Sequence, residues 1–169
     1  GDAAQGEALP LYLNDYVITG GWHRGVLPLH GTLPRVATDG FYGAGSKFTN
    51  MDETFTPIKL EVVMFPQRVV DALGYDMTEA VDGFVVPTLE HALHCMKFFL
   101  HGKPRSAIQL QHVSKWAART AGKDRTWGFD AQLWDAVAYE VMVGLARMKA
   151  KQHRGWMREV ANHAAAYFV

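Results

Sequence analysis

The sequence has a single cysteine, no formal net charge and no hydrophobic run long enough to span a membrane. One thiol, Cys95, excludes a disulfide framework within the chain. Its position beside apolar residues on an expected helix predicts a small buried hydrophobic side chain. A membrane-spanning helix needs about 20 consecutive apolar residues, so we expect no membrane span. With 49% hydrophobic and 12% aromatic residues, the chain is too apolar to be disordered and can bury a core.

The zero net charge conceals two oppositely charged halves. Residues 1–96 contain 5 Lys and Arg against 12 Asp and Glu, whereas residues 97–169 contain 12 against 5. The basic half can face nucleic acid, phosphates or an acidic partner, or the two halves can face each other. Because the basic residues are spread along expected helices rather than clustered, we do not expect the chain to bind duplex nucleic acid.

Residues 1–38 lack the pattern of a packed element. In Gly20–Gly25 and Leu27–Pro34, apolar residues alternate with glycine and proline, which disfavour helix interiors and central strands. The segment is still rich in Leu, Tyr and Trp, so we expect an extended arm that lies on its own domain or on a protein partner. Residues 39–169 are expected to form the domain. The chain starts at Gly1 without Met; if this end is processed, an intracellular and mitochondrial location is one expectation.

Short strands come first in the predicted domain, and helices follow. The predicted strands are Phe41–Gly43, Ile58–Met64 and Gly83–Val86. The predicted helices are Pro66–Leu73 closed by Gly74, a helix from Thr88 to Gly102, Ser106–Ala121, Ala131–His153 and Trp156–Tyr167. In the third of these we expect Ile108, Val113, Trp116, Ala117 and Thr120 to face inward. The fold class is therefore α+β, a small β-sheet with a cluster of about four to six helices packed on it.

The stretch Val85–Phe98 predicts a helix with an acid and a cation on one face. Thr88 suits the N-cap and Gly102 the C-terminal end. Glu90 and Lys97 are seven residues apart and share a helix face. They lie beside an apolar stripe of Leu89, Ala92, Leu93, Met96 and Leu100. A pocket could use this pair, but a first-turn Glu is favoured by the helix dipole in any protein and a mid-helix Lys is usually solvated.

Motifs for metals and cofactors are incomplete. His91, His94 and Cys95 are potential zinc ligands, but Cys95 lies about 100° around the helix from His94, and no second ligand cluster follows. The glycine-rich residues 42–48 complete neither a P-loop nor a Rossmann fingerprint, although their backbone N–H groups could face a phosphate. We therefore expect neither a bound metal nor a cofactor.

Three ordered blocks resemble the NADAR family of N-glycosidases. Asp82–Phe98 resembles the family signature dG-x-x-(F/Y)-x-T-(V/A)-E-H-x-(F/Y)-Q-x-x-K-(F/Y). Gly40–Tyr42 and Phe48–Met51 resemble the opening strand and its Ser-Asn-Phe loop. The later helix M-x-x-x-L-x-x-K-F-x-Q-x-x-x-L is matched by Met142, Leu145, Lys149, Gln152 and Trp156. The resemblance spans residues 39–163.

The resemblance implies a hydrolase of an N-glycosidic bond. The substrates described for the family are ADP-ribose attached to guanine and early riboflavin-pathway intermediates that carry a ribose phosphate. The signature glutamate maps onto Glu90, which would stabilise an oxocarbenium-like centre or activate water. Lys97 would hold a phosphate or orient Glu90. The substrate-binding residues implied are Tyr42 and Asn50, over the ribose or base, together with His94 and Lys149.

Departures from the family pattern favour a second hypothesis. The chain stops at Val169, near where the family's closing block (D-x-x-W-G and G-x-N-x-L-G-x-x-L) should begin. Ala150 replaces the family's Phe and His94 its Gln, and residues 64–82 look inserted. The departures favour a repurposed, non-catalytic accessory subunit of a larger protein assembly, held through the arm. The alternative is an active N-glycosidase that uses Glu90.

Overall fold

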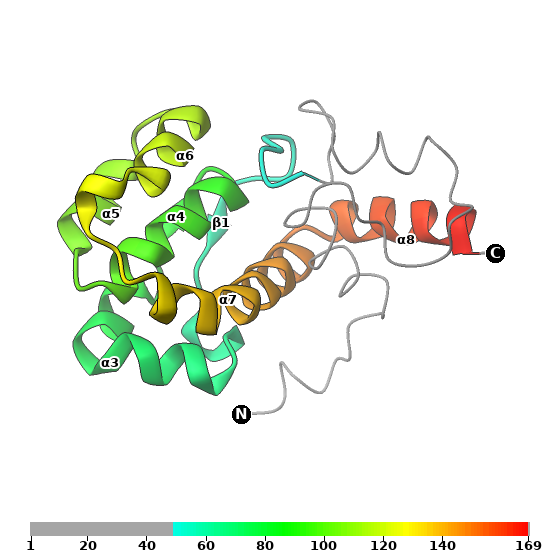
Figure 1. Cartoon of the computed structure of the whole chain (residues 1–169). Helices are drawn as coiled ribbons and strands as arrows, with labels where there is room; N and C mark the ends of the chain where they lie inside the picture. The colour runs from blue at the N-terminus through cyan, green and yellow to red at the C-terminus, as the bar shows by residue number, and fades with distance from the viewer. Residues whose placement is uncertain (1–48, 169) are drawn as a thin grey trace.

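The structure is a computed structural model that describes residues 49–168, with side chains described as far as residue 161 (Figure 1). Within this range the chain forms six α-helices and one two-stranded antiparallel sheet. The predicted α+β class is confirmed. The expected arm, the expected strand Phe41–Gly43 and the candidate residue Tyr42 lie outside the described residues. No helix within the described range combines the length and the apolar character that a membrane crossing requires.

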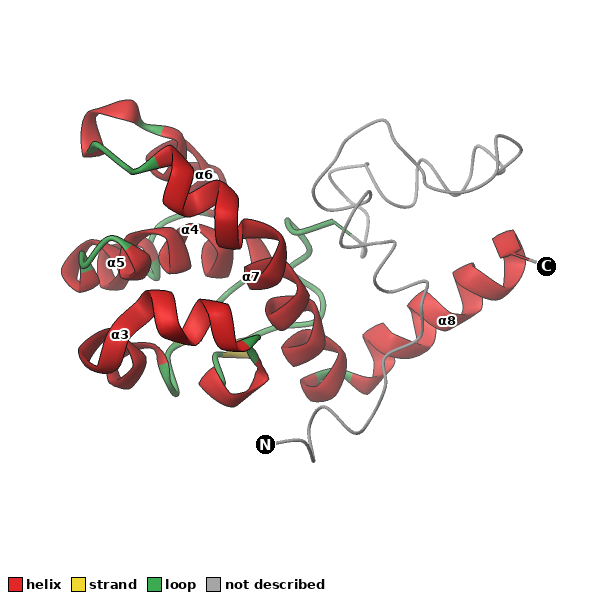
Figure 2. Ribbon diagram, turned by 60° about the horizontal axis from the view of Figure 1, so that its bottom comes forward, coloured by secondary structure: helices red, strands yellow, loops and turns green. Residues whose placement is uncertain are grey.

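The elements follow one another with short connections. In chain order they are β1 (Ile58–Lys59), the 3-10 helix η2 (Val62–Met64), α3 (Gln67–Val81), β2 (Val85–Val86), α4 (Leu89–Leu100), α5 (Pro104–Leu110), α6 (Lys115–Lys123), the 3-10 helix η3 (Arg125–Trp127), α7 (Ala131–Gln152) and α8 (Arg154–Phe168). In the sheet, Ile58 pairs with Val86 and Lys59 with Val85. Helix α8 lies at the end of α7 remote from α3 and α5 (Figures 1 and 2).

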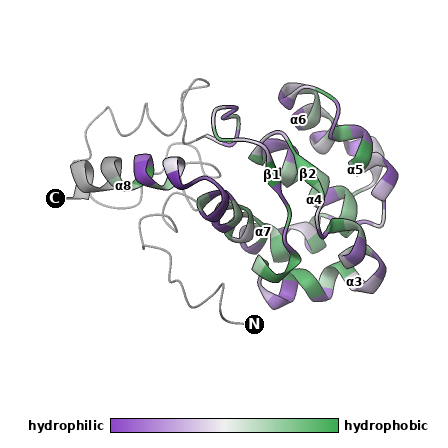
Figure 3. Cartoon of the chain, turned by 180° about the vertical axis from the view of Figure 1, so that it is seen from behind, coloured by the Kyte–Doolittle hydropathy of each residue, from purple (hydrophilic) through white to green (hydrophobic). Residues whose placement is uncertain are grey.

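Helix α4 is the centre of the fold. It contacts α3, α5, α6, α7 and β2. Ten of its twelve residues are buried, because neighbours surround it on nearly every side. The predicted single apolar stripe was therefore too narrow, and its member Leu93 is only half-buried. The N-cap prediction is confirmed, since Thr88 Oγ1 accepts a hydrogen bond from the backbone N–H of His91 at 3.1 Å. Figure 3 shows hydrophobic residues on β1, β2 and α4 and many hydrophilic ones on the outer helices.

The long helix α7 agrees with its predicted bounds to within one residue. Asp130 caps its N-terminus by accepting hydrogen bonds from the backbone N–H groups of Gln132 and Leu133. Residues spaced along the helix face the core, among them Val137, Val141, Leu145 and Met148. After His153 the chain continues as α8, whose Trp156 is fully buried. The position of α7 therefore follows from sequence signals within the helix itself, a regular apolar repeat and a strong N-cap.

The predicted strand Ile58–Met64 was too long. Only Ile58 and Lys59 are in the strand, and Val62–Met64 form a 3-10 helix. Asp82 Oδ1 accepts a hydrogen bond from the backbone N–H of Val62 at 3.1 Å and so replaces a strand partner there. Strand β2 is equally short because it is followed by Pro87, which has no N–H to donate to a ladder.

Gly74 breaks its helix without ending the helical segment. Its φ of 75° and ψ of 169° interrupt α3, a backbone conformation that favours glycine. The prediction of a break at Gly74 was therefore right. The first helical stretch closes at Gly74 as predicted, and a second stretch, which was not predicted, continues to Val81.

The predicted helix Ser106–Ala121 is in fact two helices, α5 and α6. The connection between them is fixed by His91, whose Nε2 lies 2.7 Å from the carbonyl oxygen of Val113, and by Ser114, which caps α6. All five residues that were expected to face the core are instead exposed. Ile108, Val113 and Trp116 are 48%, 38% and 51% exposed, and Ala117 and Thr120 are exposed as well.

Candidate functional site

The buried polar side chains within the described range come from three separate parts of the chain. They are contributed by the loop before β1, the first two turns of α4 and the last turns of α7: Thr49, Asn50, Asp52, Thr88, Glu90, His91, His94 and Lys149. Buried polar groups are costly unless they are paired. We refer to Asn50, Asp52, Glu90, His94 and Lys149 as the polar cluster, and it is the candidate site.

Glu90 is held in place by two hydrogen bonds. Its backbone N–H donates to the carbonyl oxygen of Asn50 at 2.9 Å, which docks the loop against the start of α4. Its Oε1 lies 2.8 Å from Nε2 of His94, one turn further along the helix. Since a carboxylate only accepts, Nε2 of His94 carries the proton. Glu90 is 8% exposed, so its carboxylate is oriented and largely shielded from water.

The other nitrogen of His94 explains why residue 122 is glycine. Nδ1 of His94 is buried and has no hydrogen-bond partner. A Cβ at Gly122 would lie 1.8 Å from that Nδ1, far inside van der Waals contact. The close approach of α6 therefore fixes the imidazole ring, and the ring in turn fixes the carboxylate of Glu90.

Asp52 and Lys149 form a buried ion pair. Lys149 Nζ lies 2.9 Å from Asp52 Oδ2, and the two side chains are 0% and 3% exposed. Asp52 also accepts hydrogen bonds from the backbone N–H groups of Thr54 and Phe55, and Lys149 Nζ lies 5.1 Å from the ring centroid of Trp156. The pair ties the loop to α7 across 97 positions of sequence.

Burial acts on both members of this pair. Desolvation raises the pKa of Asp52, but the hydrogen bond and charge of Lys149, together with the hydrogen bonds from Thr54, outweigh it and hold that pKa below 3.8. Burial lowers the pKa of Lys149, and the hydrogen bond and charge of Asp52 oppose that shift. The carboxylate of Asp52 is therefore ionised at neutral pH, where it compensates the buried ammonium group.

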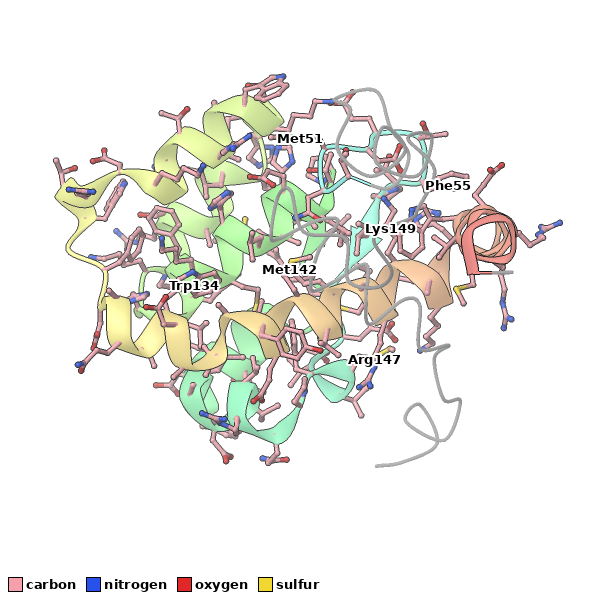
Figure 4. All side chains as sticks on the ribbon, turned by 45° about the vertical axis from the view of Figure 1, so that its right-hand side comes forward. Met51, Phe55, Trp134, Met142, Arg147 and Lys149 are labelled. Atoms are coloured by element: carbon pink, nitrogen blue, oxygen red, sulfur yellow. The ribbon has the colours of Figure 1, made fainter. Side chains whose placement is uncertain are left out.

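A third contact completes the attachment of the loop. Lys115 Nζ, on α6, donates to the carbonyl oxygen of Met51 at 2.9 Å and lies 3.3 Å from Oε1 of Glu53. Figure 4 shows Met51 and Phe55 on the loop and Lys149 between that loop and α7. The loop is thus bonded to α4, α6 and α7, and these bonds bring the polar cluster together.

Lys97 lies at the other end of the α4 face from Glu90. Its Nζ donates to the carbonyl oxygen of Gly122 at 2.8 Å and lies 4.9 Å from the ring centroid of Phe129 and 5.5 Å from that of Trp134. Burial lowers its pKa. Two helical turns, about 10 Å, separate it from Glu90 along the axis. The shared face was predicted correctly, but the partner of Glu90 is His94 rather than Lys97.

Sequence reasoning missed Asp52 and left the function of His91 open. Asp52 lies in an irregular loop, and no local spacing marks it as the partner of Lys149. In His91, Nδ1 lies 2.8 Å from the hydroxyl of Thr88 and Nε2 faces Val113, so this ring connects α4 to the turn before α6. Cys95 is buried as expected. In the part of the chain that the structure describes, no three His, Cys, Asp or Glu residues come together as a metal site.

No family model matches the chain, and no curated protein or solved structure is significantly similar to it.

Proposed function

We propose that this chain hydrolyses an N-ribosyl bond and that Glu90 is its catalytic carboxylate. The observation that carries the proposal is the burial of Glu90 in a fixed orientation, with Oε1 on Nε2 of His94 and its backbone N–H on the loop at Asn50. A carboxylate shielded from water stabilises positive charge more strongly than one in bulk solvent. The resemblance of Asp82–Phe98 to the NADAR signature supports the same reaction class.

In this mechanism Glu90 acts on the anomeric carbon of the ribose. As the bond from C1′ to the base nitrogen breaks, its electron pair leaves with the base, and C1′ gains oxocarbenium character that the carboxylate stabilises. A water molecule adds to C1′, and its proton passes to the carboxylate and then to the departing base. The substrates implied by the resemblance are ADP-ribosyl guanine and a ribose-phosphate intermediate of riboflavin synthesis.

The remaining members of the polar cluster position Glu90 and the loop beside it. His94 donates to Glu90 and keeps its carboxylate oriented. The pair of Asp52 and Lys149 holds the loop that presents Asn50 to the start of α4. Lys97 makes no contact with Glu90 and lies outside the proposed catalytic centre.

A second candidate is a non-catalytic accessory subunit of a larger protein assembly, which the chain joins through the arm at residues 1–38. In its more specific form, this proposal places the assembly in the mitochondrion. One observation favours it: within the chain, the buried carboxylate of Glu90 already has a hydrogen-bond partner in His94, and the buried ammonium group of Lys149 already pairs with Asp52. Such pairing is also what a purely structural polar core requires. On this proposal, removal of residues 1–38 releases the chain from its assembly, as size-exclusion chromatography of cell extracts would detect.

The test is Glu90→Gln in the full chain, with each proposed substrate in turn and release of free ADP-ribose or ribose phosphate followed by mass spectrometry. Loss of the carboxylate should slow release by about 100-fold or more, while the amide retains an oxygen that accepts from His94. The matched control is Glu79→Gln, an exposed glutamate of α3. An unaltered rate in Glu90→Gln would remove Glu90 from the mechanism, and a folded wild-type chain inactive on both substrates would favour the accessory subunit.

A further inference from the structure

A separate cavity lies beside Lys97. It has a volume of about 340 Å³, and its lining includes three cations and two aromatic rings: Lys97, Lys123, Arg125, Phe129 and Trp134. These residues come from α4, the end of α6, η3, the loop before α7 and the start of α7, where Figure 4 shows Trp134. A volume near 300 Å³ is at the lower end of sites for small molecules. The cavity is therefore the size of one small ligand.

The charge of the lining favours an anion. Lys97 donates one hydrogen bond, to Gly122, and no described residue accepts from its other two ammonium protons. Two carboxylates, Asp124 and Asp135, also line the cavity. Asp124 is engaged in its own turn, because its Oδ1 accepts from the backbone N–H and the hydroxyl of Thr126 at 2.9 and 2.8 Å. These hydrogen bonds hold the pKa of Asp124 below its ordinary value, so Asp124 stays ionised. Three cations therefore face the two carboxylates Asp124 and Asp135, and the lining keeps an excess of one positive charge.

Aromatic rings give the cavity a second recognition element. Phe129 packs edge-on against the buried Phe98, with ring centroids 5.0 Å apart. Trp127 packs against the same ring at 5.0 Å, and Lys103 Nζ lies 5.9 Å from the centroid of Trp127. Trp127 and Lys103 lie outside the cavity lining, but within it Lys97 Nζ lies 4.9 Å from the ring centroid of Phe129 and 5.5 Å from that of Trp134, so a cation and aromatic rings are adjacent there. Proteins that bind nucleotides combine these two features, using cations for phosphate and aromatic rings for the base.

We propose that this cavity binds one phosphorylated nucleoside. Lys97, Lys123 and Arg125 hold the phosphate, and the rings of Trp134 and Phe129 contact the base. The proposal goes beyond the proposed hydrolysis, because the cavity lies about two helical turns from Glu90, with His94 and Gly122 between them. Binding here does not require Glu90.

The experiment is a calorimetric titration of the full chain at low salt with three probes: adenosine 5′-monophosphate, adenosine and inorganic phosphate. The monophosphate should bind at least 10-fold more tightly than either part alone, because only it uses both the cations and the rings. Lys123→Gln and Arg125→Gln should each weaken it at least 5-fold. Arg105→Gln, an exposed arginine of α5 outside the cavity, is the matched control and should leave affinity within 2-fold.

Four outcomes would overturn the proposal. The first is an absence of monophosphate binding at millimolar concentration, and the second is equal affinity for phosphate and for the monophosphate. The third is a loss of monophosphate affinity in Arg105→Gln as large as in Lys123→Gln and Arg125→Gln. The fourth is tighter binding of a single-stranded oligonucleotide, with an affinity that depends on all the basic residues of the chain. Glu90→Gln should bind the monophosphate as the wild type does. If Glu90→Gln retains binding of the monophosphate but loses hydrolysis, the binding site is independent of the proposed reaction. The binding proposal and the hydrolysis proposal can therefore fail separately.

Discussion

The buried pair of Asp52 and Lys149 provides the sharpest test of how the candidate site is built. In Lys149→Met the methionine fills most of the space of the lysine but leaves the carboxylate of Asp52 buried without its counter-ion. Removing one partner of a buried ion pair costs about 3–5 kcal/mol. For a domain of this size, that loss corresponds to a fall in melting temperature of roughly 6–20 °C.

A double-mutant cycle separates this penalty from lost packing. Asp52→Asn in the Lys149→Met background removes the unpaired charge but keeps an oxygen that accepts from Thr54. We expect the double variant to recover about 2 kcal/mol or more of the free energy of unfolding, measured by urea denaturation. The matched control is Lys151→Met, two residues further along α7, because Lys151 pairs with Glu61 at the surface.

The control should lose less than about 1 kcal/mol, as surface ion pairs do. If Lys149→Met is destabilised no more than Lys151→Met, or if the double variant recovers nothing, the pair does not hold the loop as described.

The remaining predictions concern the packing and charges around the same site. Gly122→Ala should lose about 1–3 kcal/mol through overpacking against His94, and urea denaturation measures the loss; an unchanged midpoint would contradict the close packing of α6. Because the folded pKa of Asp52 lies below its ordinary value, its contribution to stability is complete above about pH 4 and is lost as the pH falls through the folded pKa. In Asp52→Asn the free energy of unfolding should therefore fall less steeply as the pH is lowered. A slope identical to that of the wild type would show that the carboxylate of Asp52 does not cause the loss of stability in acid. Burial raises the pKa of Cys95 to about 12, so its thiol should resist iodoacetamide at pH 8 until urea unfolds the chain; rapid labelling of native protein would show that it is accessible.

The sequence identified those elements whose signals are local. Helix α7 carries a long apolar repeat after the cap residue Asp130, and α4 begins at the cap residue Thr88, so their positions followed from spacing and capping alone. The break between α5 and α6 depends on a hydrogen bond from His91 to Val113 across 22 positions. No pattern within either helix predicts it, and the faces of both helices were wrong as a result.

The candidate site was recoverable only in part. Glu90, His94, Asn50 and Lys149 were all selected from the signature blocks, and the structure places them in one polar cluster. Asp52 was not selected, because its function depends on a partner 97 positions away. Lys97 shares a face with Glu90, but its ammonium group contacts Gly122 and the aromatic rings of α7 and its preceding loop. Helical periodicity does not specify these contacts.

The central claim, that the buried carboxylate of Glu90 performs hydrolysis, is tested most directly by product release from Glu90→Gln beside Glu79→Gln and the wild type. The account predicts free ADP-ribose or ribose phosphate from the wild type and Glu79→Gln, and a rate lower by about 100-fold or more from a folded Glu90→Gln. Equal product from all three proteins would contradict it.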